Sequence, residues 1–216
     1  PKMTPKRKPG RPRDKARSDL QRSRILDWSA KVFAKEGFRN ADVQVIADHL
    51  QLGKGTVYRY FPSKEALFLS VVDQAMQSMQ SEVDRAVAGV QDPYERIACT
   101  FRVYLEFFQT HPDFVELLIQ ERAVFKDRKN PTYLQHLVQR VKPWQAILRE
   151  LMAQGLVRPI PVEQITTVVS NLLYGTMFTN HFSGSSKPAK SQTSEMLDII
   201  CRGIFTAEGI RRGKLS

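Results

Sequence analysis

The chain has 216 residues, which is long enough for one large or two small domains with a substantial core. Its formal net charge is +11. Residues 1–64 hold 16 lysines and arginines against 6 acids, whereas residues 65–216 hold 17 against 16. A basic amino-terminal third on a nearly neutral body indicates nucleic-acid binding through that third. Cys99 and Cys201, the two cysteines, form no Cys-x-x-Cys pattern, which argues against a disulfide scaffold or a structural zinc site.

Export and membrane attachment are also disfavoured. The opening is basic and rich in proline, without the apolar core of a signal peptide. The most apolar stretch, Ile165–Phe178, is short and interrupted by threonine, serine and asparagine, so it is not expected to span a bilayer. The basic segment lacks the apolar face of an interfacial helix. We expect a cytoplasmic, nucleoid-associated protein with no membrane partner.

Residues 1–17 are predicted to form a disordered basic arm, because they carry eight cations and one acid among four prolines. The central Pro-Gly-Arg-Pro sequence around Arg11 resembles an AT-hook, which places arginine in a narrow A·T minor groove. The residue before the glycine is Pro9 rather than the usual arginine. A cationic tail that binds phosphates without sequence preference is therefore an equal alternative. Both interpretations predict that Arg11 and Arg13 contact DNA.

A first helix is predicted over residues 19–35, ending at Gly37. Two short helices around a turn are then expected between Asp42 and Phe61. Asp42 can cap the first of them, and Gly53 is expected to take the positive φ that a tight turn requires. The first short helix has one apolar stripe at helical spacing, formed by Val43, Ile46, Ala47 and Leu50. This plan is that of a helix-turn-helix.

The second short helix has an apolar inner face, Val57 and Phe61, and a polar outer face. Cations, a hydroxyl and phenols can donate to phosphates or to base edges. An amphipathic hairpin buried in a core would explain the inner face but not so many large polar groups on the outer one. The outer residues are Lys54, Thr56, Tyr58, Arg59 and Tyr60.

The segments RILDWSAKVFAKEGF, VQVIADHL and GKGTVYRYFPSKEALF resemble the amino-terminal domain of the tetracycline-repressor (TetR) family, over roughly residues 20 to 70. The resemblance implies an all-α protein, with a three-helix helix-turn-helix DNA-binding domain over 18–64 joined to a helical effector-binding and dimerisation domain over 65–216. It also implies base contacts by Gln44, Lys54, Gly55 and Tyr58, and phosphate contacts by Thr56, Tyr60 and Lys64. Trp28 and Ala41 depart from the family, which usually has a small residue and a hydroxyl residue there.

Further helices follow. Pro62 stops the preceding helix and Ser63 can cap a long one reaching about residue 88, which is able to connect the DNA-binding unit mechanically with the body. Pro143 is expected to kink its helix or to split off the first turns. The remaining helices are expected at about 93–110, 112–126, 131–154, 162–182 and 191–207. No alternating strand pattern competes with this all-α assignment.

No enzymatic, metal or cofactor site is predicted. The Gly53–Thr56 sequence lacks the glycine spacing of a phosphate-binding loop, and its lysine does not directly precede the threonine. The four histidines are scattered without ligand-like spacing, and no Gly-x-Ser-x-Gly elbow occurs.

The many aromatic residues of the body have two interpretations. Ordinary core packing is one. The other, implied by the family resemblance, is a cavity between helices for a small hydrophobic or aromatic effector. The residues predicted to line it are Tyr104, Phe108, Trp144 and Tyr174, since tyrosine and tryptophan combine an apolar body with a polar group.

The last two long helical patterns are apolar on more than one face, so both faces must be buried. A central core helix would satisfy this pattern. The family resemblance instead implies a four-helix interface between two subunits. The residues predicted at that interface are Ile165, Val169, Leu172, Leu173, Leu197, Ile200 and Ile204.

The leading hypothesis is a homodimeric transcriptional regulator, expected to act as a repressor that a small-molecule effector releases from a palindromic operator. One alternative is a constitutive DNA-binding protein without an effector. The other is a small helical enzyme or carrier that happens to be basic.

Overall fold

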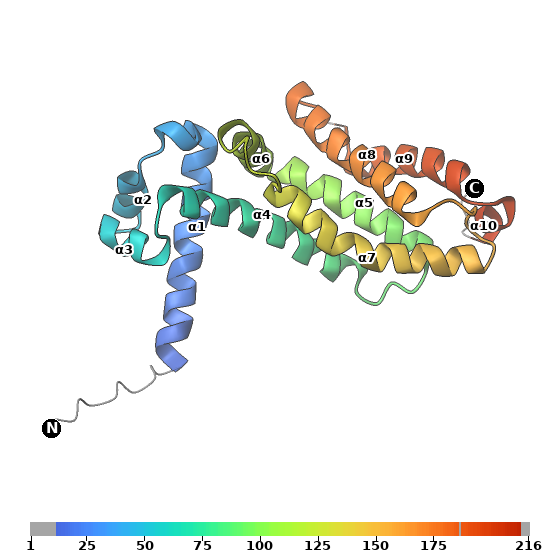
Figure 1. Cartoon of the computed structure of the whole chain (residues 1–216), viewed down its shortest axis with the longest axis horizontal. Helices are drawn as coiled ribbons and strands as arrows, with labels where there is room; N and C mark the ends of the chain where they lie inside the picture. Colours follow the sequence, from blue (N-terminus) through green and yellow to red (C-terminus); the bar gives the residue numbers. More distant parts are fainter. Residues whose placement is uncertain (1–11, 186, 213–216) are drawn as a thin grey trace. The chain divides into compact units, whose positions relative to one another are not determined.

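The computed structural model describes residues 12–185 and 187–212, which form helices and no strand (Figure 1). The chain divides into two compact units between Val71 and Val72. Unit 1 holds α1 (Pro12–Asn40), α2 (Val43–His49), α3 (Lys54–Tyr60) and the first turns of α4 (Lys64–Val87). Unit 2 holds the rest of α4, then α5 (Pro93–Thr110), α6 (Pro112–Val124), α7 (Thr132–Ala153), α8 (Val162–Ser183), α9 (Ala189–Ile204) and α10 (Ala207–Arg212). Within these described ranges, no helix is both long and apolar enough to cross a bilayer.

Local capping shapes unit 1 as the sequence predicts. The Asp42 carboxylate accepts a hydrogen bond of 2.8 Å from the Gln44 amide and caps α2. The Ser63 hydroxyl accepts one of 3.0 Å from the Ala66 amide in the first turn of α4. Gly37 has a φ of 77° and interrupts α1 where the first helix was expected to end. These observations confirm the three predictions. They could be made from the sequence because each feature depends on neighbours within a few residues.

The turn between α2 and α3 differs from the prediction. Gly53 has an ordinary φ of −74°, and the positive φ, 55°, falls on Gln51. The amide of Gln51 donates to the Asp48 carbonyl and that of Leu52 donates to the Ala47 carbonyl, which is a Schellman ending of α2. This ending requires the left-handed residue directly after Leu50, two positions before the glycine.

The core of unit 1 joins its helices through large apolar side chains. Phe33 of α1 and Phe68 of α4 meet edge to face, with ring centroids 5.2 Å apart. Val57 of α3 and Phe61, which ends it, are almost fully buried, as their inner-face spacing predicts. The inner side of α3 is therefore packed against this core.

The first helix begins earlier than expected. The sequence places its start at Asp19, whereas α1 starts at Pro12, where proline's fixed φ suits a first helical turn. Residues 12–17 of the predicted arm are thus helical. Arg11 lies outside the described residues, as does most of the AT-hook-like sequence.

Unit 2 is a helical bundle in which α5 packs on α8 and α9, and α7 packs on α8 (Figure 1). α7 runs through Pro143 as one helix, so its first turns are not split off. The carbonyl of Gln139, which loses its amide partner to the proline, belongs to an exposed residue that water can reach.

The end of the chain departs from the predicted single helix over 191–207. α9 ends at Ile204, Phe205 forms an isolated bridge with Val157, and α10 follows. The Tyr94 hydroxyl donates a 2.8 Å hydrogen bond to the Gly209 carbonyl, which ties α10 to the start of α5.

Candidate nucleic-acid interface and ligand cavity

The outer face of α3 is polar and open to solvent. Tyr58 is 38% exposed, and Gly55 and Arg59 are exposed beside it. Lys54 and Thr56 are half-buried, whereas Val57, on the opposite side, is fully buried. A short helix with a buried apolar side and an exposed polar side can present its side chains to a nucleic-acid groove.

Two predicted DNA contacts are held by acids of α2. The Lys54 ammonium lies 3.1 Å from the Asp42 carboxylate, and the Gln44 side-chain amide donates a 2.6 Å hydrogen bond to Asp48. The Gln44 backbone amide, followed by Lys54, lowers the pKa of the Asp42 carboxyl from its usual value. Asp42 therefore stays ionised, caps α2 and holds Lys54.

The remaining predicted contacts in unit 1 lie against α1. The Lys64 ammonium donates a 3.0 Å hydrogen bond to the Arg39 carbonyl and sits 5.1 Å from the centre of the Phe38 ring. The Tyr60 hydroxyl accepts a 3.4 Å hydrogen bond from Ser18. Both side chains remain partly exposed, Tyr60 at the end of α3 and Lys64 at the start of α4.

Trp28, unusual for the family, stacks on His49. Their rings are nearly parallel, with centroids 3.3 Å apart, and the Lys31 ammonium lies 5.1 Å from the Trp28 ring. The half-buried indole thus packs α1 against the end of α2, within unit 1.

Unit 2 contains a cavity of about 240 Å³ between α4, α5, α7, α8 and α9. Its lining is mostly apolar and includes Met79, Phe101 and Leu148. Of the predicted effector residues, Tyr104 and Trp144 line it. An apolar cavity with a few polar groups suits a small organic ligand.

A pair of tyrosines supplies hydroxyls to this cavity. The Tyr104 and Tyr133 hydroxyl oxygens lie 3.3 Å apart, and that of Tyr104 also donates to the Met177 sulfur at 3.6 Å. Burial raises the pKa of Tyr133 to about 12 and that of Tyr104 well above its ordinary value. Both phenols are therefore neutral at physiological pH.

The other two predicted effector residues lie apart from the cavity lining. Phe108 borders a second hollow with Met177 and His181, between α5 and α8. Tyr174 packs behind Tyr133, with ring centroids 4.3 Å apart. The structure thus brings Tyr104 and Trp144 together in one cavity and places Phe108 and Tyr174 elsewhere.

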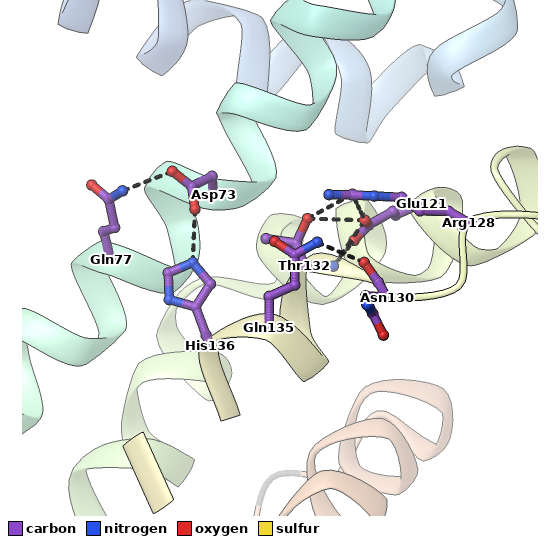
Figure 2. A network of polar contacts seen from close by, with 8 residues as sticks. All are labelled: Asp73, Gln77, Glu121, Arg128, Asn130, Thr132, Gln135 and His136. Atoms are coloured by element: carbon purple, nitrogen blue, oxygen red, sulfur yellow. Dashed lines mark hydrogen bonds and ion pairs between the residues drawn. The ribbon is translucent and has the colours of Figure 1, made fainter. Parts of the chain in front are cut away.

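Polar ties join α4 to the cavity wall formed by α7. His136 Nε2 lies 2.7 Å from the Asp73 carboxylate, which also accepts a 2.7 Å hydrogen bond from Gln77 (Figure 2). One turn further along α7, the Arg140 guanidinium meets Asp84 through two contacts of 2.6 and 3.2 Å. His136, Arg140 and Asp84 all line the cavity.

A second polar cluster fixes the start of α7. The buried Glu121 carboxylate of α6 accepts hydrogen bonds from the Thr132 amide and hydroxyl, each at 2.9 Å, and from Arg128 (Figure 2). A carboxylate on the first amide of a helix also suits the helix dipole. The cavity helix α7 is thereby anchored at its amino-terminal end.

The predicted dimer residues of α8 and α9 fall on two sides. Ile165 and Leu173 are buried inside unit 2, and Val169 and Leu197 pack against its core. Ile200 lines the cavity, whereas Leu172 is 37% exposed. Among the side chains of these two helices that the structure describes, which do not include that of Ile204, the most exposed apolar ones are Val168, Phe182 and Ile199.

Sequence reasoning missed the three basic residues of the cavity lining: Arg96, His136 and Arg140. Each resembles an ordinary solvated residue in the sequence. Only the packing of helices that are distant in the chain places them at the cavity.

The chain thus combines a basic helix-turn-helix unit with a helical unit that contains an apolar cavity. Residues 25–71 match the sequence profile of the bacterial regulatory proteins of the tetR family, which is a family of regulators rather than of enzymes. Residues 25–71 therefore carry the amino-terminal domain that is typical of the tetR family.

Relatives extend the similarity beyond that domain. The HTH-type transcriptional regulator YerO of Bacillus subtilis is 26% identical over 85% of this chain and 65% of its own length. The HTH-type transcriptional repressor NicS of Pseudomonas putida is 30% identical over 48% of this chain and 49% of its own length. The chain thus spans about half to two thirds of these relatives.

Solved structures share the fold over most of the chain. The transcriptional regulator FadR of Bacillus subtilis, solved in complex with stearoyl-CoA, superposes with a TM-score of 0.71 at 17% identity. The match covers 84% of this chain and 98% of FadR.

Proposed function

We propose that the protein is a homodimeric transcriptional repressor that binds a palindromic operator and is released from it by a small-molecule effector. The observation that carries this proposal is the exposed polar face of α3 in a basic helix-turn-helix unit. The name of NicS as a repressor and the stearoyl-CoA complex of FadR support repression and ligand response.

In the proposed complex, α3 enters the major groove and reads base edges, while residues around it hold the phosphates. Gln44 and Lys54 would exchange their bonds with acids of α2 for bonds with DNA. Base contacts are assigned to Gln44, Lys54, Gly55 and Tyr58, and phosphate contacts to Thr56, Tyr60 and Lys64. Arg11 and Arg13 would add further DNA contacts outside the major groove that α3 occupies.

A two-fold operator requires two copies of the chain, whose recognition helices sit about 34–36 Å apart on one turn of DNA. The interface is assigned to α8 and α9, because both retain large exposed apolar side chains such as Phe182 and Ile199. One face of these helices packs inside the subunit, and the other is available to a partner.

The cavity would act on DNA binding through α4. This helix begins in unit 1, and in unit 2 it is tied to α7 through Asp73–His136 and Asp84–Arg140. A ligand that prefers a different spacing of α4 and α7 shifts the population towards that spacing. The operator affinity then falls by the ratio of the ligand's affinities for the two states.

The proposal is tested by selecting bound fragments from random DNA and measuring affinity for the selected sequence by gel shift. Tyr58→Ala should reduce the preference for that sequence by about tenfold, since it removes an exposed base-reading side chain. Arg149→Ala, which removes an exposed cation of unit 2 paired with Glu163, is the control and should retain wild-type preference. Absence of any preferred sequence for the wild type would contradict the proposal.

The effector is then sought among compounds that release the selected DNA. A compound that binds the cavity without changing DNA affinity would favour the alternative, a constitutive DNA-binding protein.

A further inference from the structure

Arg96 of α5 lines the cavity without a charge partner. Its Nε atom is buried and has no hydrogen-bond acceptor among the residues that the structure describes. Within the same residues, no aspartate or glutamate lies within ion-pair distance of its guanidinium.

The other charged groups of the lining are compensated. Arg140 is paired with Asp84 through its two terminal guanidinium nitrogens, and Asp84 also accepts a hydrogen bond from Gln80. His136 is paired with Asp73. Arg96 is therefore the one cation on the described lining that retains an unneutralised charge.

An arginine in this position cannot relieve its burial by losing its proton, because the guanidinium stays charged in proteins. A partly buried charge without a partner is costly, and an anion that enters the cavity removes that cost. The planar guanidinium matches a carboxylate with two parallel hydrogen bonds. The surrounding apolar side chains, among them Phe101, Leu148 and Ile97, suit a hydrocarbon body.

We propose that the cavity binds a small hydrophobic carboxylate, with its carboxylate on Arg96 and its hydrocarbon part among the apolar side chains. This deepens the proposed function by naming the chemical class of the effector, and it rests on that function only for the step from binding to DNA release. The cavity volume of about 240 Å³ favours a compact molecule, since sites for drug-sized ligands usually measure about 300–1,000 Å³.

The test measures ligand binding to the full chain without DNA, by isothermal titration calorimetry. Matched probes differ only in the head group: decanoate, decanol and decylamine, with phenylacetate and benzyl alcohol as an aromatic pair. We expect each carboxylate to bind at least about tenfold more tightly than its matched alcohol, because a hydrogen-bonded charge pair is lost in the alcohol. Decylamine should bind most weakly.

Variants then assign the preference to Arg96. Arg96→Gln should reduce the carboxylate-to-alcohol ratio to about one, and Arg96→Lys should restore part of it as a point charge without the planar fork. Arg102→Gln is the matched control: it removes a cation of the same helix that is paired with Glu106 and lies outside the cavity lining, so it should preserve the wild-type ratio.

Equal binding of carboxylates and alcohols by the wild type would overturn the inference, as would failure of both carboxylates to bind. So would a carboxylate preference that survives in Arg96→Gln. A separate gel shift with decanoate distinguishes the two proposals: selective binding that leaves DNA affinity unchanged supports the carboxylate site and contradicts the effector-release function.

Discussion

Asp42 caps α2 with the same carboxylate that holds Lys54, a predicted base contact. The acid thus stabilises the helix-turn-helix and, in the proposed complex, would compete with DNA for Lys54. Separating these two roles is possible because asparagine caps helices about as well as aspartate does but carries no charge.

We predict that Asp42→Asn binds non-specific DNA more tightly than the wild type. The variant frees the Lys54 ammonium for a phosphate, so the slope of log affinity against log salt should steepen by about one unit. Fluorescence anisotropy with a random duplex over a salt series measures both quantities. Asp42→Ala serves as the comparison, because it also loses the cap and should lower the thermal midpoint. Weaker binding by Asp42→Asn with unchanged stability would mean that Asp42 supports rather than opposes DNA contact.

Tyr133 gives a pH-dependent prediction. Its pKa is about 12 in the folded chain against an ordinary value of 10.0, so the unfolded chain loses this proton first. The corresponding stability, about 2–3 kcal/mol, is fully present below pH 10 and is lost as the pH rises towards 12. Tyr133→Phe should therefore show a shallower decline in unfolding free energy over this range, measured by urea titration. Identical declines in both proteins would indicate that Tyr133 ionises freely in the folded state.

For single residues, the sequence predicts a feature where that feature depends on near neighbours in the chain. The caps at Asp42 and Ser63 were predictable because donor and acceptor are two or three residues apart. Gly53 was a wrong choice for the positive φ because glycine is permissive, whereas the hydrogen bonds that end α2 select Gln51. The unpaired state of Arg96 depends on the absence of acids from distant helices, which no local pattern reveals.

Among the elements, α10 depends most on long-range contacts. Its Gly209 carbonyl accepts a hydrogen bond from Tyr94, and a Cβ at Gly209 would overlap the carbonyl oxygen of Leu156. A helix of six residues is too short to persist alone in water. The sequence predicted no helix there, because the residues that hold it lie about 50 and 115 positions away.

We predict that Gly209→Ala destabilises the protein by about 1–3 kcal/mol, because the methyl group forces α10 away from Leu156. At about 2–4 °C for each kcal/mol in a chain of this size, differential scanning fluorimetry should resolve the change. Glu208→Ala, which alters a partly exposed neighbour whose ion pairs within residues 12–212 are with Arg211 and Arg212, should give a much smaller shift. Equal shifts in the two variants would show that α10 contributes through its surface charges rather than through its packing.

For the whole molecule, apolar periodicity predicted an all-α chain, and the breaks at proline and glycine located most helices within a few residues. The same periodicity could not separate the inner from the outer face of α8. Ile165 and Leu173 lie inside the subunit, whereas Leu172 and Val168 face outwards. The face of α8 that remains free for a partner is the one that α5 and α7 do not cover. This coverage is determined by the folded bundle and not by the local sequence.

We predict that Leu172→Glu yields monomers that keep wild-type helicity, because the side chain is exposed in the single chain but would be buried in the proposed interface. Loss of the second half-site should weaken operator binding by about a hundredfold. Analytical ultracentrifugation and gel shift measure the two effects. Val138→Glu, which places the same charge on an exposed apolar position of α7, is the control and should remain dimeric. A Leu172→Glu monomer with wild-type operator affinity would contradict the dimer-based mechanism.

The positions of the two tryptophans have an optical consequence. The chain contains only Trp28, stacked on His49 in the DNA-binding unit, and Trp144, at the wall of the cavity. Each unit therefore carries one tryptophan. Under excitation selective for tryptophan, the emission of Trp144→Phe reports on the helix-turn-helix alone, and that of Trp28→Phe reports on the cavity alone. The protein thus contains its own pair of spectroscopic labels, with which occupancy of the cavity and rearrangement of the DNA-binding unit can be followed separately in time.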